Sequence, residues 1–170
     1  LLDARGAQPG DTVSLVMPYG LTTIQLLLGA MYGGFTVNPV NLLSQPEQMR
    51  YVLMHSDCSV VCVAPEWEQR VRKFLTGIDR PVAVVVCDPN AGALPEIEEL
   101  NAVEDLAPPA PATVALLMYP SGTTGVPKGV MLTQANLTAN AQAIGTEHAL
   151  NHDDRVLAVL PLYHINAFAV

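Results

Sequence analysis

The sequence predicts an α/β fold in which a mostly parallel sheet is covered by helices on both faces. Short apolar runs alternate with helical segments over residues 12–87, which is the order that builds parallel βαβ units. Half of the 170 residues are hydrophobic and only 14% are charged, which suits strands buried on both faces and excludes a disordered chain. No apolar run approaches the ~18 residues that a membrane-spanning helix requires.

Strands are expected where aliphatic and β-branched runs are bounded by turn residues. The first begins after the turn Pro9-Gly10-Asp11 and stops before Pro18. Pro39 either weakens the second strand or places it near a sheet edge. The expected strands cover residues 12–17, 35–40, 59–63, 81–87, 113–119, 130–132 and 156–160. The strand over 81–87 is expected to be buried.

Helices are expected where apolar residues recur with helical spacing. Thr133 is a plausible N-cap for the last of them. The expected helices cover residues 21–32, 45–55, 66–75 and 134–149. The residues expected to face inward are Met49, Val52 and Leu53 in the second helix, and Trp67, Val71, Phe74 and Leu75 in the third.

Charge and cysteine content narrow the function classes. The net charge of −8, without a basic stripe, argues against partners such as nucleic acid or anionic lipid and favours small-molecule chemistry. Cys58, Cys62 and Cys87 lack the ligand pattern of a zinc site, and we interpret them as reduced structural thiols of a cytoplasmic protein.

The chain is expected to consist of two portions. Residues 1–112 form a first α/β portion that ends in an acidic, proline-rich connection over 88–112. Residues 113–170 begin a second portion, which carries a glycine-rich loop between two strands. The chain is expected to be a piece of a longer protein, cut at both ends, because it lacks an initiator Met and stops at residue 170 within an apolar run.

The glycine-rich loop, Pro120-Ser121-Gly122-Thr123-Thr124-Gly125-Val126-Pro127-Lys128-Gly129, carries the chemistry. Glycines let backbone amides approach a ligand, hydroxyls donate hydrogen bonds, and a lysine supplies a point charge. Lys128 is one of only two lysines in an acidic chain. Together these groups suit the oxygens of a polyphosphate.

The P-loop of nucleoside triphosphatases is the obvious alternative for this loop. Counted from Gly122, Lys128 falls at the P-loop position, but Pro127 replaces the required glycine and Gly129 replaces the required Ser or Thr. A P-loop also opens directly into a helix, whereas residues 130–132 read as a strand. A kinase or ATPase of that type is therefore disfavoured.

The loop resembles the AMP-binding signature of the adenylate-forming enzymes, which include acyl-CoA synthetases, luciferase-like ligases and peptide-synthetase adenylation domains. The matching residues continue through Leu132-Thr133-Gln134-Ala135-Asn136-Leu137. Leu160-Pro161-Leu162-Tyr163-His164-Ile165-Asn166 resembles the next motif of that family, and residues 9–41 are similar to the start of its N-terminal domain. The chain departs from the family pattern at Pro120, Gln134 and Ala167.

The resemblance implies that this chain is part of the N-terminal domain of an adenylate-forming enzyme, with residues 113–170 as the start of its AMP-binding portion. The implied reaction is ATP-dependent activation of a carboxylic acid to an acyl-adenylate, followed by thioester formation with coenzyme A. The acyl- and aryl-CoA ligase branch fits better than the peptide-synthetase branch. Partners would be a small carboxylate, ATP, coenzyme A and Mg²⁺.

The resemblance also assigns roles to individual residues. The phosphates would be held by Ser121, Gly122, Thr123, Thr124, Gly125 and Lys128. Thr124 would lie near the metal, Lys128 and His164 would be catalytic, and Tyr163 and His164 would lie by the acyl substrate. Without the motif, His164 and Tyr163 would be interpreted as core residues. The other histidines match no motif, and we interpret His55, His148 and His152 as surface or capping residues.

Further catalytic groups of the family would lie beyond residue 170, so the chain alone is expected to be inactive. Two alternatives stay open at this point: a non-catalytic nucleotide-binding module and a peptide-synthetase-type adenylation domain.

Overall fold

A computed structural model describes residues 1–92, 107–120, 126–157, 159–161 and 163–164. Its helices and strands follow the expected order, with boundaries within a few residues of those predicted. The strands are β1 (Thr12–Val16), β2 (Thr36–Pro39), β3 (Val60–Val63), β4 (Ala83–Val86), β5 (Val114–Met118) and β6 (Val130–Thr133). The helices are η1 (Asp3–Arg5), α1 (Leu21–Tyr32), α2 (Pro46–His55), α3 (Pro65–Leu75) and α4 (Gln134–Glu147).

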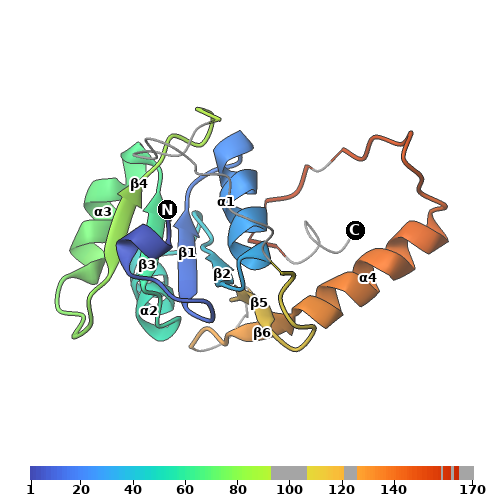
Figure 1. The fold of residues 1–170 in the computed structure, drawn as a ribbon. Helices are drawn as coiled ribbons and strands as arrows, with labels where there is room; N and C mark the ends of the chain where they lie inside the picture. The colour runs from blue at the N-terminus through green and yellow to red at the C-terminus, as the bar shows by residue number, and fades with distance from the viewer. Residues whose placement is uncertain (93–106, 121–125, 158, 162, 165–170) are drawn as a thin grey trace.

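The strands form one sheet in the order β4-β3-β1-β2-β5-β6 (Figure 1). The pairs among β1 to β5 are parallel, and β6 runs antiparallel to β5. Val13 of β1 lies in register with Val37 on one side and Val60 on the other, so three valines form one row across the centre of the sheet. The predicted mostly parallel sheet is confirmed.

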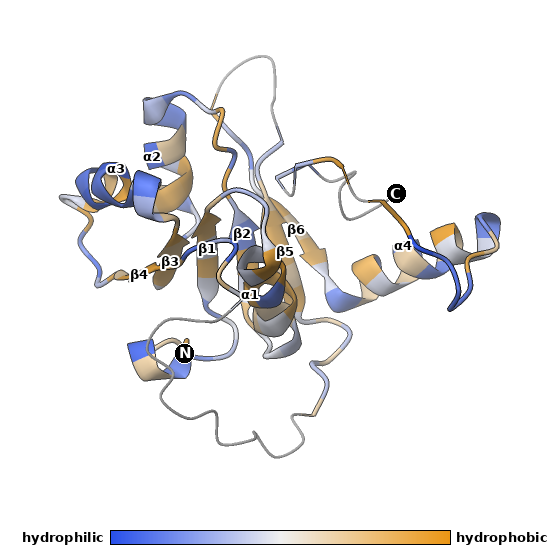
Figure 2. Cartoon of the chain, turned by 90° about the horizontal axis from the view of Figure 1, so that it is seen from above, coloured by the Kyte–Doolittle hydropathy of each residue, from blue (hydrophilic) through white to orange (hydrophobic). Residues whose placement is uncertain are grey.

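Helices cover both faces of the sheet, as predicted (Figure 2). Alternate residues of each strand point to opposite faces. Val13 and Leu15 pack in one cluster with α1, whereas Val16 packs in a second cluster with the inward residues of α2 and α3. The buried residues Met49, Val52 and Leu53 of α2 are the three that helical spacing predicts.

Side chains of neighbouring residues cap the start of helix α4. Thr133 Oγ1 accepts a hydrogen bond from the backbone N–H of Asn136 at 3.2 Å, and Asn136 Oδ1 accepts one from the backbone N–H of Thr133 at 3.0 Å. This reciprocal capping confirms Thr133 as the N-cap. Gln134, which departs from the family pattern, donates its side-chain amide to the carbonyl of Met31 at 2.8 Å and so ties α4 to the end of α1.

The edge position considered for Pro39 is wrong, because β2 lies in the middle of the sheet between β1 and β5. The N–H groups of Thr36 and Val40 donate to β1 and the residue before it. Since N–H groups alternate between the two neighbours of a parallel strand, the nitrogen of Pro39 faces β5. Because this nitrogen points away from β1, the proline removes no hydrogen bond to β1. The register pair between β2 and β5 is Val37 with Leu116.

Two further strand predictions are corrected. Among the described residues, β4 is an edge strand that pairs with β3 alone, and Val85 is the one residue of the strand that is buried. The described residues of 156–160 form no strand, and Val156, Leu157 and Val159 are exposed. β-Branched composition produces a strand only where a neighbouring strand pairs with it, and no described residue pairs with this segment.

The division of the chain at residue 112 stays a prediction.

No helix among the described residues is both long enough and apolar enough to cross a membrane. Cys58, Cys62 and Cys87 are buried free thiols.

Candidate functional site

The glycine-rich loop leaves the sheet at the carboxyl end of β5. Because β1, β2 and β5 are parallel, the segments that follow them emerge at the same edge of the sheet. Residues 121–125, which include the predicted phosphate-binding residues Ser121, Gly122, Thr123, Thr124 and Gly125, lie outside the described residues. Their place in the site, and the metal role of Thr124, therefore stay predictions. The described flanks of the loop are Tyr119 and Pro120 on one side and residues 126–129 on the other.

A pocket of about 220 Å³ opens at this edge. It lies where β1 leads into α1 on one face and β2 leads into α2 on the other, which is the crossover point where open α/β sheets bind ligands. Apolar side chains and a few polar groups form its wall. The lining residues are Leu15, Met17, Pro18, Tyr19, Thr23, Pro39, Val40, Leu42, Leu43, Pro161 and Tyr163.

Tyr163 and His164 lie next to each other, with ring centroids 4.8 Å apart and planes tilted by 49°. Tyr163 is half-buried and lines the pocket, whereas His164 is exposed and is not part of the lining. The backbone N–H of His164 donates to the carbonyl of Pro161 at 2.8 Å, which fixes the turn. Burial, and secondarily the nearby Tyr163, raise the pKa of Tyr19 in the same wall.

Lys128 is exposed and immediately precedes Gly129, from which the chain enters β6. A Cβ added at Gly129 would lie 2.9 Å from Leu117 Cδ1 and 3.3 Å from Tyr119 Cζ, so the backbone beside Lys128 rests directly on these two side chains. Within the described part of the chain, no contact joins Lys128 to Tyr163 or His164.

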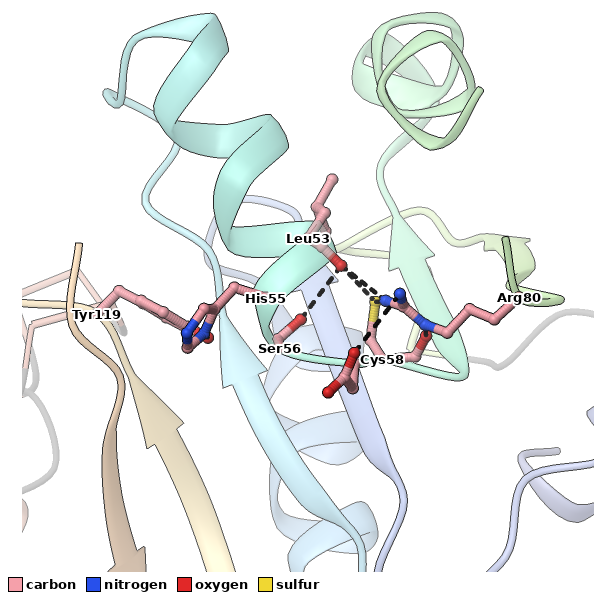
Figure 3. A network of polar contacts seen from close by, with 7 residues as sticks. Leu53, His55, Ser56, Cys58, Arg80 and Tyr119 are labelled. Atoms are coloured by element: carbon pink, nitrogen blue, oxygen red, sulfur yellow. Dashed lines mark hydrogen bonds and ion pairs between the residues drawn. The ribbon is translucent and has the colours of Figure 1, made fainter. Parts of the chain in front are cut away.

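His55 is exposed, as the sequence predicts, but its contacts with neighbouring side chains were not predicted. Its Nδ1 lies 2.9 Å from the hydroxyl of Tyr119, the residue just before Pro120 (Figure 3). Tyr51 stacks on the imidazole with ring centroids 5.1 Å apart. The one available signal was the spacing of Tyr51 and His55, which places them on the same face of α2.

The phenol of Tyr119 is held in its neutral form. Burial is the main reason that its pKa rises to about 12, and the nearby Tyr51, Asp57 and Cys58 add to the effect. An ordinary phenol, with a pKa of 10.0, is already neutral at pH 7, and the raised pKa keeps the Tyr119 hydroxyl protonated to a higher pH.

Known proteins match the chain along its whole length. Residues 1–170 match the family described as AMP-binding enzyme. The chain is 50% identical over 168 residues to the sulfoacetate–CoA ligase of Cupriavidus necator, covering 98% of this chain and 33% of the relative. It is 34% identical over 172 residues to the feruloyl-CoA synthase of an Amycolatopsis species, covering 99% of this chain and 32% of the relative.

Solved structures share the fold. The ATP-bound MatB of Rhodopseudomonas palustris superposes with a TM-score of 0.82 at 24% identity, covering 99% of this chain and 33% of that protein. The chain thus spans about a third of the length of the relatives it matches. The family match covers all 170 residues, and the similar proteins include CoA ligases, as the motif of the glycine-rich loop predicts. The chain therefore belongs to the AMP-binding enzyme family.

Proposed function

We propose that this chain is the nucleotide-binding start of an AMP-forming acid–thiol ligase. In the first step a carboxylate oxygen attacks the α-phosphorus of ATP, and the bond to pyrophosphate breaks. In the second step the sulfur of coenzyme A attacks the acyl carbon, and AMP leaves. The observation that carries this proposal is a loop sequence of glycines, hydroxyls and Lys128 whose first described residue, Pro120, follows the carboxyl end of β5, in a chain of the AMP-binding enzyme family.

The first step brings two anions together while negative charge accumulates on the departing pyrophosphate. Backbone amides and hydroxyls from 121–125 would hold the β- and γ-phosphates, and Lys128 would place its ammonium against them. The exposure of Lys128 leaves the ammonium accessible to a nucleotide. Since the chain carries a net charge of −8, this local cation would matter more than any general attraction for ATP.

Magnesium would accompany the nucleotide. Hydroxyl and phosphate oxygens are the hard ligands that Mg²⁺ prefers, and the Thr124 hydroxyl is the proposed protein group beside it. When bound, the ion would neutralise charge on the phosphates.

Tyr163 and His164 are the proposed groups on the acid side of the reaction. The support is their place beside the apolar pocket, where Tyr163 is part of the wall and His164 is exposed next to it. Tyr163 would contact the acyl group. His164 would lie by the carboxylate or adenylate and control the approach of the thiol.

The acid that is activated is expected to depend on residues outside this chain. The same segment matches one relative named for sulfoacetate and another named for a feruloyl group, which are chemically different acids. The segment would therefore carry the nucleotide chemistry that such ligases share. Sulfoacetate is the first acid to test, because that relative is 50% identical.

The test is carboxylate-dependent ATP–pyrophosphate exchange by the full-length protein that carries this chain, with sulfoacetate, ferulate, fatty acids and short-chain acids. We expect exchange with one class of acid, followed by AMP and thioester formation when coenzyme A is added. ATP binding without exchange for any acid would contradict the proposal in favour of a non-catalytic nucleotide-binding module. The 170-residue chain alone is expected to give no exchange.

A further inference from the structure

We propose that His55 is a positioning residue for the Lys128 end of the phosphate loop, and that it acts through Tyr119. The proposal rests on the proposed function, because it assigns Lys128 to the phosphates of ATP. His55 itself would touch neither ATP nor the acid.

Tyr119 connects the two described ends of the loop. It follows β5 and precedes Pro120, and its ring carbon Cζ would lie 3.3 Å from a Cβ at Gly129, the neighbour of Lys128. The strand register pairs Met118 with Val130 next to this contact. The Tyr119 ring, together with the side chain of Leu117, therefore limits how closely the backbone beside Lys128 can approach β5.

His55 contacts the hydroxyl group of that ring. The 2.9 Å contact joins its Nδ1 to the Tyr119 hydroxyl, and the two rings meet edge to face at 87° with centroids 5.8 Å apart. Tyr51 stacks on the imidazole, so the imidazole has aromatic neighbours in two directions. The imidazole of His55 is exposed, and its hydrogen bond and two aromatic contacts restrict its rotation.

The end of α2 that carries His55 is itself anchored (Figure 3). Arg80 Nη2 donates to the carbonyl of Leu53 at 3.0 Å, and its Nε donates to the carbonyl of Cys58 at 3.2 Å. The carbonyl of Leu53, near the end of the helix, also accepts from Ser56 Oγ at 3.4 Å and Cys58 Sγ at 3.5 Å, so the guanidinium adds the shortest of three side-chain contacts there. Arg80, α2, His55 and Tyr119 form a continuous series of contacts that ends at the backbone next to Lys128.

The contact between His55 and Tyr119 does not depend on the charge of the imidazole. A neutral Nδ1 accepts a hydrogen bond from the phenol, and a protonated Nδ1 donates one to the phenol oxygen. The expected role is therefore fixed positioning, which operates in both protonation states.

The test compares His55→Ala, Tyr119→Phe and the double variant in the full-length protein. Each single variant should raise the KM for ATP in pyrophosphate exchange by about 3- to 10-fold, the loss expected for one hydrogen bond. The KM for the acid should not change. The double variant should be no worse than either single variant, because both remove the same interaction. His55→Asn, which places an amide group near the position of Nδ1, should restore most of the ATP affinity.

Met54→Ala is the matched control, since Met54 is the exposed neighbour of His55 on the same helix. It should leave the KM for ATP unchanged. Unchanged ATP parameters in His55→Ala and Tyr119→Phe, with a lower melting temperature alone, would overturn the positioning role. So would additive losses in the double variant.

Direct calorimetric measurement of the Kd for ATP separates this proposal from the proposed function. If no acid supports exchange, the ligase assignment fails, while weaker ATP binding by His55→Ala still supports the positioning role. If exchange occurs but the variants bind ATP as the parent does, only the positioning role fails.

Discussion

The side-chain amide of Asn38 donates a hydrogen bond to Oγ of Ser14 at 2.9 Å, across the register pair that these residues form between β2 and β1. Both residues are fully buried. Asn38 Oδ1 has no hydrogen-bond partner in the described part of the chain. A buried acceptor without a partner opposes folding, so this polar pair is a weak point in an otherwise apolar sheet centre.

Replacing both partners should therefore cost little. Ser14→Ala together with Asn38→Val is expected to leave the free energy of unfolding unchanged or to raise it by about 1 kcal/mol. Ser14→Ala alone should lower it by about 1–3 kcal/mol, because the amide of Asn38 then loses its acceptor. Urea unfolding of the 170-residue chain measures both values. A double variant less stable than the Ser14→Ala variant would contradict this account.

Two glycines of the α1 region should respond to alanine in opposite directions. A Cβ at Gly20 would lie 2.1 Å from the carbonyl oxygen of Pro89, which also accepts a hydrogen bond from the N–H of Thr22. Gly20→Ala must move this connection and should destabilise the fold by about 1–3 kcal/mol. Gly29 lies within α1 and a Cβ there would meet nothing within 4 Å. Gly29→Ala should raise stability by about 0.5–1 kcal/mol, since alanine restricts the unfolded chain.

Thermal unfolding of the two variants gives the comparison. Equal melting temperatures for Gly20→Ala and the parent would show that the loop after β4 can move away from α1 without loss.

The two lysines of the chain form a matched pair for testing the phosphate site. Lys128→Ala in the full-length protein should slow adenylation by about 10²-fold, because a charge aimed at the leaving phosphates is lost. Lys73→Ala removes an exposed lysine of α3 and should leave the rate unchanged. The measurement is pyrophosphate exchange, with circular dichroism to check that the fold is intact. Equal rates for both variants would remove Lys128 from the site.

Alkaline titration should detect the half-buried phenol of Tyr119. Its pKa in the folded state is about 12, above the ordinary value of 10.0 that applies to the unfolded chain. The neutral phenol therefore stabilises the fold fully below pH 10, and this contribution is lost as the pH rises to 12. In Tyr119→Phe, the increase in phenolate absorbance near pH 12 should disappear. The free energy of unfolding should also fall less steeply between pH 10 and pH 12 than in the parent. If the free energy of unfolding of Tyr119→Phe fell with pH as steeply as that of the parent, the raised pKa would not belong to Tyr119.

Most of the secondary structure could be predicted because its causes are local. Helical spacing identified the inward face of α2, and Thr133 as a candidate N-cap marked the start of α4. The glycine-rich loop carried enough of a motif to indicate the family. The placement of residues 121–125 stays a prediction, and with it the detailed phosphate contacts.

Sequence alone was enough to predict most of the alternation of strands and helices, the inward face of α2, and the family to which the chain belongs. Periodicity, turn residues and capping act within a few positions along the chain, so they can be read directly. Tertiary structure alone decided that β2 lies centrally despite Pro39, that residues 156–160 form no strand where they are described, and that His55 meets Tyr119 across 64 positions. These outcomes depend on which distant segments pair and pack, and local preference carries no information about such neighbours.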